Sequence, residues 1–507
     1  MNYSPKGFYV WDTWFLNRAN ELHVFHLQLA REGNTDPDAK QTAQHLGHAV
    51  TSDLIDWETL PPALGPDPTL ADDDLQPWTG SAVWKDNQAH LFYTMRGSAN
   101  EGRQQKIGLA TSTDLRNWKR HPGNPVLTPD PRWYATAKRP VPGVVDCRDL
   151  YVIPAPGGGW FGFFATRVPG SELPETSVIG CAYSEDLVHW EQRPPAFAPG
   201  KYACLEVPDV FFLNGKWYLL CLLGHYYGNR GIWSDPHVVG GTMFAVADRP
   251  EGPYVELGDN VLTAAMTTAP LSARSVLFEE ERHLLYTDRE RIGHRDENSM
   301  FWGTLTTPKL LRTSGDYLRA CYSPRIEKRI DVVFFNSAKD RLPPESGTPW
   351  GQMWALPSGV WTQEDTIRGS CRTGWSVRSL ELAPESFIFE ANIVLESGVA
   401  AGLTVRMDGQ MSGGVVALDA QEQTVFFAQG PSFDFMEKRQ TGVVCGKKTH
   451  VRIVQRLEHL EVYVDDVLKI AFSRYRGIGG KLGLFVDRGK AVFTEVRVSS
   501  LRVTRPT

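Results

Sequence analysis

A seven-residue motif that recurs at long intervals places the strongest constraint on the fold of this chain. Residues 51–57 (TSDLIDW), 112–118 (STDLRNW) and 184–190 (SEDLVHW) all fit the pattern [ST]-x-D-L-x-x-W. A divergent fourth copy, ADRPEGPY, ends at Tyr254. The aromatic ends of the four copies are 61, 72 and 64 residues apart. These spacings are too long for a solenoid repeat and suit four-stranded propeller blades with insertions.

Short aromatic and β-branched segments give the number of repeat units. They are five to eight residues long and lack helical periodicity, and most follow a turn such as Asn214-Gly215. The segments occupy residues 23–28, 90–94, 159–166, 216–223 and 283–287. Five segments predict five blades. The alternative is a generic β-sandwich with similar turns. Three copies of the motif, each in register with a strand, argue against it.

The last third of the chain has a different pattern. Its 507 residues exceed the roughly 250–300 at which one hydrophobic core stops growing, so a second domain is expected. Residues 323–350 contain a short helix or strand and then turn-rich sequence, and from Ser386 onward period-two strands alternate with Gly and Asp turns. We therefore predict an all-β protein: a five-bladed β-propeller over residues 1–322, a linker over 323–350 and a C-terminal β-sandwich over 351–507.

Composition excludes several classes of partner. Hydrophobic residues make up 42% of the chain without a run long enough to cross a bilayer, so no membrane partner is expected. With 53 Lys and Arg against 59 Asp and Glu, the net charge of −6 provides no basic field for nucleic acid. The sequence does not specify an oligomeric state.

The cysteines and the N-terminal residues indicate a compartment. The seven cysteines are odd in number, widely spaced and without a C-x-x-C pair, which argues against both a disulfide framework and a zinc site. The first residues, MNYSPKGFYVWDTWF, lack the basic and apolar regions of a secretory signal. We therefore expect a cytoplasmic protein with free thiols. Because there is no H-E-x-x-H motif or glycine-rich phosphate loop, no metal or organic cofactor is expected.

Three acidic residues stand in apolar surroundings, where a charge is costly to keep. Asp12, Asp149 and Glu206 lie 13, 14 and 13 residues before the middle of the next aromatic segment, so they occupy one equivalent position in units one, three and four. Equivalent positions on different blades converge at one end of the central channel. Three carboxylates in one pocket would repel one another, and this repulsion raises the pKa of at least one of them. One acid could then stay protonated near neutral pH while another is ionised, as glycoside hydrolysis requires.

Structural roles remain open for each acid taken singly. Asp12 could be a turn or capping residue, and Glu206 could be a strand-end charge. Asp149 could simply pair with Arg148, which could also offset the repulsion between the acids or bind a sugar hydroxyl. The shared position in the repeat favours catalysis for the three acids together.

Several motifs, in order along nearly the whole chain, carry a family resemblance. WDTWF stands where W-x-N-D-P-N-G would be, and HVFHLQ, LGHAVTSDLIDWETLPPAL, WTGSAV, CRDL and LEVPDVF follow in sequence. Together they resemble glycoside hydrolase family 32, the β-fructofuranosidase, invertase and levanase group, which is related to families 43, 62 and 68. The strand patterns LEVYVDD and KLGLFVD are similar to the appended β-sandwich of that family.

The resemblance implies a role for each acid: Asp12 as nucleophile, Glu206 as general acid/base and Asp149 as transition-state stabiliser beside Arg148. It also implies contacts with the sugar in the −1 subsite for three residues: Gln28, Trp78 and Ser81. Each of these has a structural alternative, because Trp78 could cap the second blade, Ser81 could satisfy a strand end and Gln28 could make a structural hydrogen bond.

Two departures from the family pattern bear on the substrate. The first is at the nucleophile, where the segment Trp11-Asp12-Thr13-Trp14 keeps the acid but lacks the Asn and Pro of the family pattern, and Trp14 could reshape the subsite. The second is Val207, which replaces the Cys that follows the acid/base in the family. The resemblance implies a retaining glycoside hydrolase that cleaves β-fructofuranosides, sucrose or short fructo-oligosaccharides, by double displacement. The alternatives are an arabinofuranosidase or a fructosyltransferase on the same scaffold, or a non-catalytic sugar-binding protein.

Overall fold

The computed structural model describes residues 2–34, 44–137, 143–170, 176–224, 240–265, 271–344, 359–408, 412–430 and 434–503. Strands dominate these parts of the chain, as the sequence predicts. The helices in them are 3-10 turns of three to six residues, at Ser98–Asn100, Ile292–His294 and Pro324–Arg329. No helix in the described ranges therefore has the length and hydropathy needed to cross a membrane.

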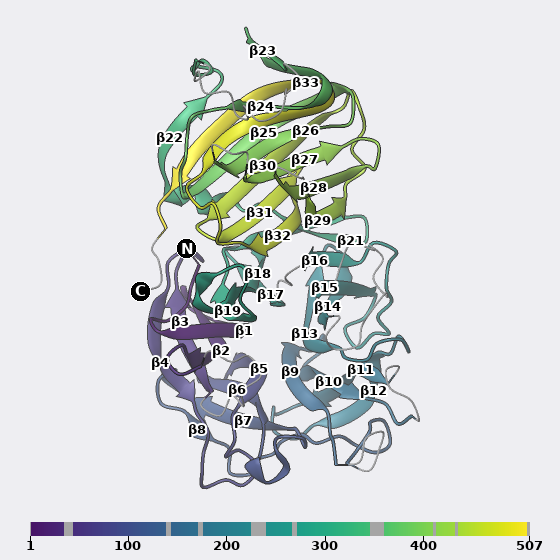
Figure 1. Ribbon diagram of the computed structural model, residues 1–507. Coiled ribbons are helices and arrows are strands. Elements are labelled where there is room, and N and C mark those ends of the chain that lie inside the picture. Colours follow the sequence, from purple (N-terminus) through teal and green to yellow (C-terminus); the bar gives the residue numbers. More distant parts are fainter. Residues whose placement is uncertain are drawn as a thin grey trace.

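Antiparallel blades surround a central axis in the lower part of Figure 1; blades two, three and four are separate four-stranded sheets, and blades one and five belong to a larger sheet that also includes the C-terminal strands. Blade one contains β1 (Phe8–Arg18), β2 (Glu21–Ala30), β3 (His45–Thr51) and β4 (Glu58–Leu64). Blade two contains β5 (Trp78–Lys85), β6 (Gln88–Met95), β7 (Lys106–Ser112) and β8 (Lys119–Arg120). Blade three contains β9 (Cys147–Pro154), β10 (Trp160–Arg167), β11 (Ser177–Ser184) and β12 (Glu191–Phe197). Blade four contains β13 (Glu206–Leu213), β14 (Lys216–Gly224), β15 (Gly240–Ala247) and β16 (Val261–Ala265).

Blade five closes the ring. It contains β17 (Leu271–Phe278), β18 (Glu281–Arg291), β19 (Met300–Leu305), β20 (Lys309–Ser314) and β21 (Tyr317–Cys321), and β18 pairs with β19 along one part and with β20 along another. The N-terminal segment joins this blade through a bridge between Tyr3 and Leu305, and β1 pairs with β19 at Val10 and Gly303. The first and last blades are thus bonded to each other, and the predicted five-bladed propeller is confirmed.

The recurring motif forms the turn after the third strand of blades one to three. In each copy the Asp side chain accepts hydrogen bonds from two backbone N–H groups, as Asp186 does from Val188 and His189 at 2.8 Å each. The Leu is buried with a left-handed φ, and the Trp contacts an aromatic ring of the preceding blade, as Trp190 contacts Phe92 with ring centroids 5.8 Å apart. The motif therefore both closes a turn and joins blades.

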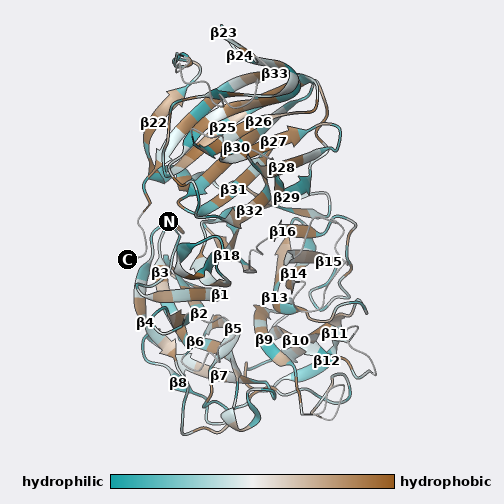
Figure 2. Cartoon of the chain, in the orientation of Figure 1, coloured by the Kyte–Doolittle hydropathy of each residue, from teal (hydrophilic) through white to brown (hydrophobic). Residues whose placement is uncertain are grey.

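The C-terminal part is a sandwich of two antiparallel sheets, above the propeller in Figure 1. Its strands are β22 (Ile330–Asn336), β23 (Val360–Gln363), β24 (Ile367–Ser379), β25 (Ser386–Ser397), β26 (Ala400–Met407), β27 (Gly414–Asp419), β28 (Thr424–Gln429), β29 (Asp434–Gln440), β30 (Lys448–Arg456), β31 (His459–Val464), β32 (Val467–Ser473) and β33 (Lys481–Leu501). The long β33 belongs to both sheets, because its first part pairs with β26 and its second part with β25. Figure 2 shows brown and teal residues alternating along several of these strands, as expected for sheets with one buried face. β22 lies inside the span predicted as a linker, and it pairs with β33.

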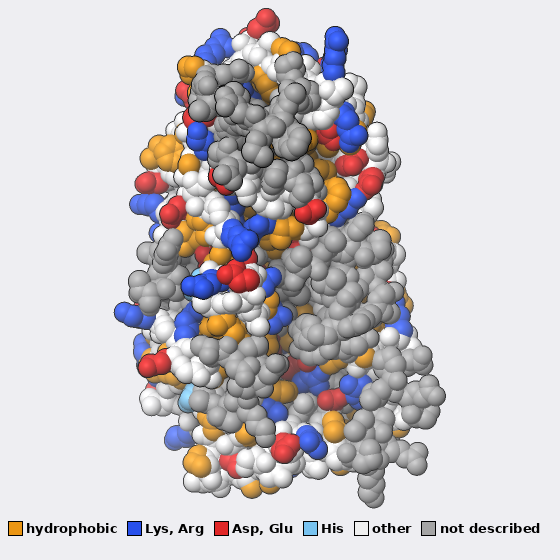
Figure 3. Space-filling view, viewed as in Figure 1, with side chains coloured by type: hydrophobic (Ala, Val, Ile, Leu, Met, Phe, Trp, Pro, Cys, Tyr) orange, Lys and Arg blue, Asp and Glu red, His pale blue; other side chains and the backbone are white. Residues whose placement is uncertain are grey.

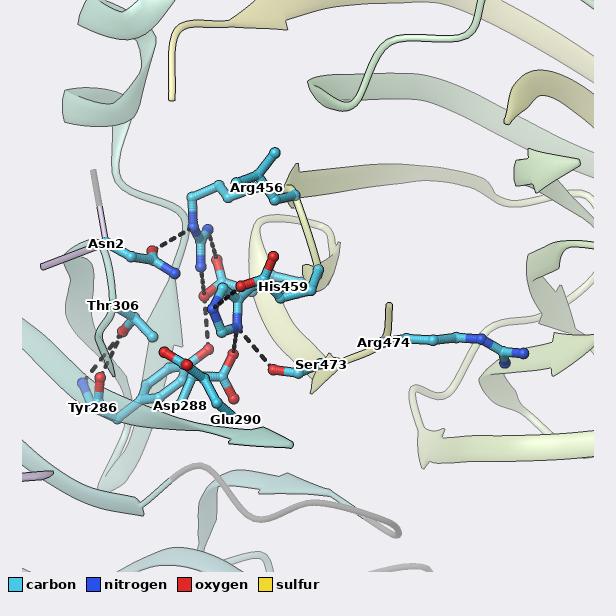
Figure 4. A network of polar contacts seen from close by, with 12 residues as sticks. Asn2, Tyr286, Asp288, Glu290, Thr306, Arg456, His459, Ser473 and Arg474 are labelled. Atoms are coloured by element: carbon cyan, nitrogen blue, oxygen red, sulfur yellow. Dashed lines mark hydrogen bonds and ion pairs between the residues drawn. The ribbon is translucent and has the colours of Figure 1, made fainter. Parts of the chain in front are cut away.

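Propeller and sandwich share a buried interface. An apolar cluster contains residues of both, such as Leu284 and Tyr286 from β18 with Ile388 from β25 and Tyr463 from β31. A polar network lies beside it (Figure 4), in which Glu461 accepts hydrogen bonds from Arg456 at 3.0 Å and from Tyr286 at 2.7 Å. On the outer surface, among the residues coloured in Figure 3, Lys and Arg side chains are interspersed with Asp and Glu.

Candidate active site

The inner strand of every blade is interrupted near its start. The pairing of β1, β5, β9, β13 and β17 with the second strand of each blade shifts register at this point, as at a β-bulge. Four residues at these bulges have a left-handed φ: Asp12 (36°), Asp149 (60°), Val207 (53°) and Ser272 (48°). A bulge redirects a side chain out of the regular alternation. Five bulges at one end of the ring therefore direct side chains toward a common region.

Asp12 is held by two neighbouring blades. The hydroxyl of Thr79 on β5 donates a hydrogen bond to Oδ2, and the hydroxyl of Ser272 on β17 donates one to Oδ1. Burial raises the pKa of Asp12, while these two hydrogen bonds and the positive charges of Arg274 and Arg148 oppose the rise. Both oxygens of the carboxylate are thus fixed by side chains that stabilise its ionised form.

Asp149 lies deeper in the same site, with 3% of its surface exposed. Its Oδ2 accepts a hydrogen bond of 3.0 Å from the backbone N–H of Val207, which belongs to blade four. Burial raises the pKa of Asp149 to about 7; the negative charges of Glu206 and Asp12 add to the rise, and Arg148 opposes it. Asp149 is therefore close enough to both Glu206 and Asp12 for their charges to affect its ionisation, and the structure brings all three acids together.

Arg148 links the acids. Its Nη2 lies 3.1 Å from Glu206 Oε1 and 3.1 Å from the Sγ of Cys204, and its Nε lies 3.6 Å from Asp149 Oδ2. On the other side, Nη1 donates to Asp146 Oδ1 at 3.0 Å. The guanidinium is buried, so the carboxylates balance a charge that would otherwise be unfavourable there.

The residues predicted to contact sugar have different surroundings. Trp78 is partly exposed at the start of β5, immediately before Thr79, and the Arg96 guanidinium lies 3.7 Å from its ring centroid. Gln28 is buried on β2 beside Gly47, where a Cβ would come within 2.2 Å of the Gln28 Oε1. The hydroxyl of Ser81 donates to the carbonyl of Leu150 at 2.7 Å and accepts from the N–H of Val152 at 3.2 Å, so it joins blade two to blade three.

Trp14 does not line the site, and its predicted part in the subsite is wrong. The side chain is fully buried and stacks on Phe25, with ring centroids 6.3 Å apart. The bulge at Asp12 is the physical reason, because it inserts one residue into the alternation of β1. Tyr9 and Trp11 before the bulge therefore share one core cluster with Trp14 after it.

Thr79, Ser272 and Arg274 were not identified from the sequence. A signal for the first two was present, since Thr79 and Ser272 each stand 13 residues before Phe92 and Leu285, the middle residues of the second and fifth aromatic segments. They occupy the repeat position of the three acids but carry hydroxyl groups. Arg274 had no such signal, because its partners belong to other blades. Among the described residues, no group of three or more His, Cys, Asp or Glu is arranged to hold a metal ion.

Comparison with known proteins gives the family. Residues 16–225 match the model of the glycosyl hydrolases family 32 N-terminal domain, a range that includes Asp149 and Glu206 and begins just after Asp12. An insoluble isoenzyme of β-fructofuranosidase from Arabidopsis thaliana is 30% identical over 370 residues. These residues are 69% of this chain and 53% of that protein, so the chain spans about half of its length.

Solved structures share the architecture over the full chain. Fructan 1-exohydrolase IIa from Cichorium intybus has a TM-score of 0.70 at 15% identity, over 99% of this chain and 97% of that one. Exo-inulinase from Aspergillus awamori has a TM-score of 0.69 at 16% identity, over 100% and 98% of the two chains. At these identities the likeness shows a common fold. The matched N-terminal domain and the curated relative assign the chain to glycosyl hydrolase family 32.

Proposed function

We propose that this chain is a retaining glycoside hydrolase that cleaves β-fructofuranosides, sucrose or short fructo-oligosaccharides, by double displacement. In this proposal Asp12 is the nucleophile, Glu206 the general acid/base and Asp149 the stabiliser of the transition state. The observation that carries the proposal is the meeting of carboxylates from three blades in one site: Asp149 and Glu206 contact one buried arginine, Arg148, and the charge of Asp12 acts on Asp149. Relatives named β-fructofuranosidase and fructan 1-exohydrolase support the choice of glycone.

The first step requires an ionised nucleophile and a protonated acid. The hydrogen bonds from Thr79 and Ser272 favour the anionic form of Asp12 and orient it toward the anomeric carbon. Glu206 donates a proton to the glycosidic oxygen as the bond to that oxygen breaks, and a glycosyl–Asp12 ester forms. Arg148 contacts Glu206 through one oxygen, Oε1.

The second step reverses the role of the acid. Glu206, now ionised, takes a proton from water, which attacks the anomeric carbon and releases Asp12. Two inversions give net retention of configuration. Asp149 and Glu206 share one arginine, so their titrations are coupled and the protonation of each depends on the other. This coupling allows one acid to hold a proton near neutral pH while another carboxylate in the site stays charged.

A substrate screen tests the proposal. We expect chromatography to show fructose released from sucrose or from short inulin or levan oligomers, and no release by the Asp12→Asn variant. Arabinose released from arabinofuranosides would favour an arabinofuranosidase, and longer oligosaccharides formed at high sugar would favour a fructosyltransferase. Sugar binding without turnover of any furanoside would contradict the proposal and indicate a sugar-binding protein.

We also propose that the protein works in the cytoplasm. All seven cysteines are free in the structure, and five of them are buried. Burial raises the pKa of Cys147 and of Cys204 well above that of an ordinary thiol, which keeps both uncharged and unreactive. Thiol titration of denatured protein, freshly isolated without reductant, should find essentially all of the cysteines. Two or more missing thiols would contradict this location.

A further inference from the structure

Arg274 stands two residues after Ser272 on β17 and has no exposed surface. Its side chain reaches three other blades. The Nη1 donates a hydrogen bond to the carbonyl of Pro208 on β13, and Nη2 donates one of 3.4 Å to the carbonyl of Gly80 on β5. The guanidinium carbon lies 4.8 Å from the centre of the Tyr151 ring on β9. One cation from blade five therefore lies against blades two, three and four.

Arg274 lies beside both groups that hydrogen bond to the nucleophile, because it donates to the carbonyl of Gly80, the residue after Thr79, and stands two residues after Ser272 on β17. In the described parts of the chain its hydrogen bonds go to backbone carbonyl oxygens, so its positive charge acts on the buried carboxylates of Asp12 and Asp209 without a direct hydrogen bond to either. Burial raises the pKa values of Asp12 and of Asp209, and the charge of Arg274 lowers both. Arg148, the other cation acting on Asp12, is in contact with the carboxylates of Asp146 and Glu206.

We propose that Arg274 is a positioning residue that keeps the Asp12 carboxylate ionised, and therefore nucleophilic, in a buried site. The inference deepens the proposed function and rests on it for the role of Asp12. β17 then supplies two groups to the nucleophile, the Ser272 hydroxyl by direct contact and the Arg274 charge through space. A buried carboxyl without a nearby cation would remain protonated to higher pH.

The test compares variants of the full chain that keep or remove this charge. In Arg274→Gln the charge is lost, and the acid limb of the kcat/KM profile should move to higher pH by about one unit or more. Arg274→Lys keeps the charge, so its limb should stay near that of the parent protein. A purely structural role would lower the melting temperature and kcat of both variants and leave the limb in place.

A paired variant keeps the test valid if Arg274→Gln does not fold. Arg274→Met combined with Asp209→Asn removes a buried cation and a buried anion together, so the net charge of the region is preserved. The acid limb of the kcat/KM profile of this paired variant should still move to higher pH. The acid limb of Asp209→Asn alone should not move to higher pH. An unmoved limb in both the paired variant and Arg274→Gln would overturn the proposal.

A second readout does not depend on activity. Infrared titration should show the carbonyl stretch of one protonated carboxyl that disappears in Asp12→Asn, and this band should persist to higher pH in Arg274→Gln than in the parent protein. If the parent protein turns over no furanoside, the proposed function fails, and the infrared titration still decides whether Arg274 controls the ionisation of Asp12. A band with the same midpoint in both proteins would refute that control.

Discussion

At the residue scale, the site is organised around charges that cannot be considered separately. Arg148 contacts both Asp149 and Glu206, and the negative charge of Glu206 is one cause of the raised pKa of Asp149. Because electrostatic coupling is reciprocal, the charge of Asp149 must also disfavour ionisation of Glu206. Asp149 would then help to keep the general acid protonated at the pH of catalysis.

Asp149→Asn tests this coupling. The variant should lose about a hundredfold or more in kcat, because it lacks a group that stabilises the transition state. Without the negative charge Glu206 ionises more readily, so the alkaline limb of the residual pH–rate profile should move to lower pH. The profile is measured with a substrate whose leaving group needs protonation. A limb that stays in place or moves upward would show that Asp149 does not act on Glu206 electrostatically.

At the element scale, the repeated turns explain how much the sequence could predict. The propeller was recognisable because each Asp-Leu-x-x-Trp turn needs the same side chains for the same backbone contacts, and the repeat position of Asp12, Asp149 and Glu206 follows from it. Trp14 was misplaced because a bulge shifts the alternation of β1 without leaving a sign in the residue pattern. Arg274 contacts strands that are far apart in the sequence, and such contacts cannot be recognised from a local sequence pattern.

The turn of blade three offers a matched test of this explanation. Asp186 and the neighbouring Glu185 are both exposed, but Asp186 accepts two backbone hydrogen bonds. Asp186→Ala should lower the free energy of unfolding by about 1–2 kcal/mol. Glu185→Ala should change it by no more than about 0.5 kcal/mol. Urea denaturation at neutral pH measures both, and equal effects of the two substitutions would contradict a structural role for the motif.

The same variants should differ in their response to acid. Hydrogen bonds to the Asp186 carboxylate hold its pKa below the usual value of an aspartate. Its contribution to stability is therefore present above the unfolded-state pKa and is lost as the pH falls toward the folded-state pKa. The difference in stability between the parent protein and Asp186→Ala should shrink in acid.

At the scale of the whole molecule, the propeller and the sandwich are joined by buried charges (Figure 4). His459 on β31 faces Asp288 on β18, with Nδ1 2.5 Å from Oδ2, and Ser473 on β32 at 2.8 Å; its Nε2 lies 3.6 Å from Glu458. Burial alone would lower the pKa of His459, and the positive charge of Arg456 also lowers it. The carboxylates of Asp288 and Glu458 outweigh both effects and raise it above the ordinary value. The raised pKa favours the imidazolium form, which pairs with Asp288 across the interface between the two domains.

The pH dependence of unfolding tests this interface. Since the folded-state pKa of His459 is raised, its contribution to stability is complete below the unfolded-state pKa of about 6.5 and is lost as the pH rises through the folded-state value. The parent protein should thus lose more stability than His459→Gln between neutral and alkaline pH in calorimetry. His189→Gln, at an exposed histidine, should behave like the parent protein. Parallel pH profiles of the parent protein and His459→Gln would contradict the charged interface.

The central claim is that Asp12 attacks the anomeric carbon and forms a covalent intermediate. Proton NMR of the first product, recorded before mutarotation, tests it most directly. The account predicts that this product has the anomeric configuration of the substrate, because two displacements restore it. A first product of inverted configuration would contradict the account, since it would mean that water attacks the sugar directly and that Asp12 is not the nucleophile.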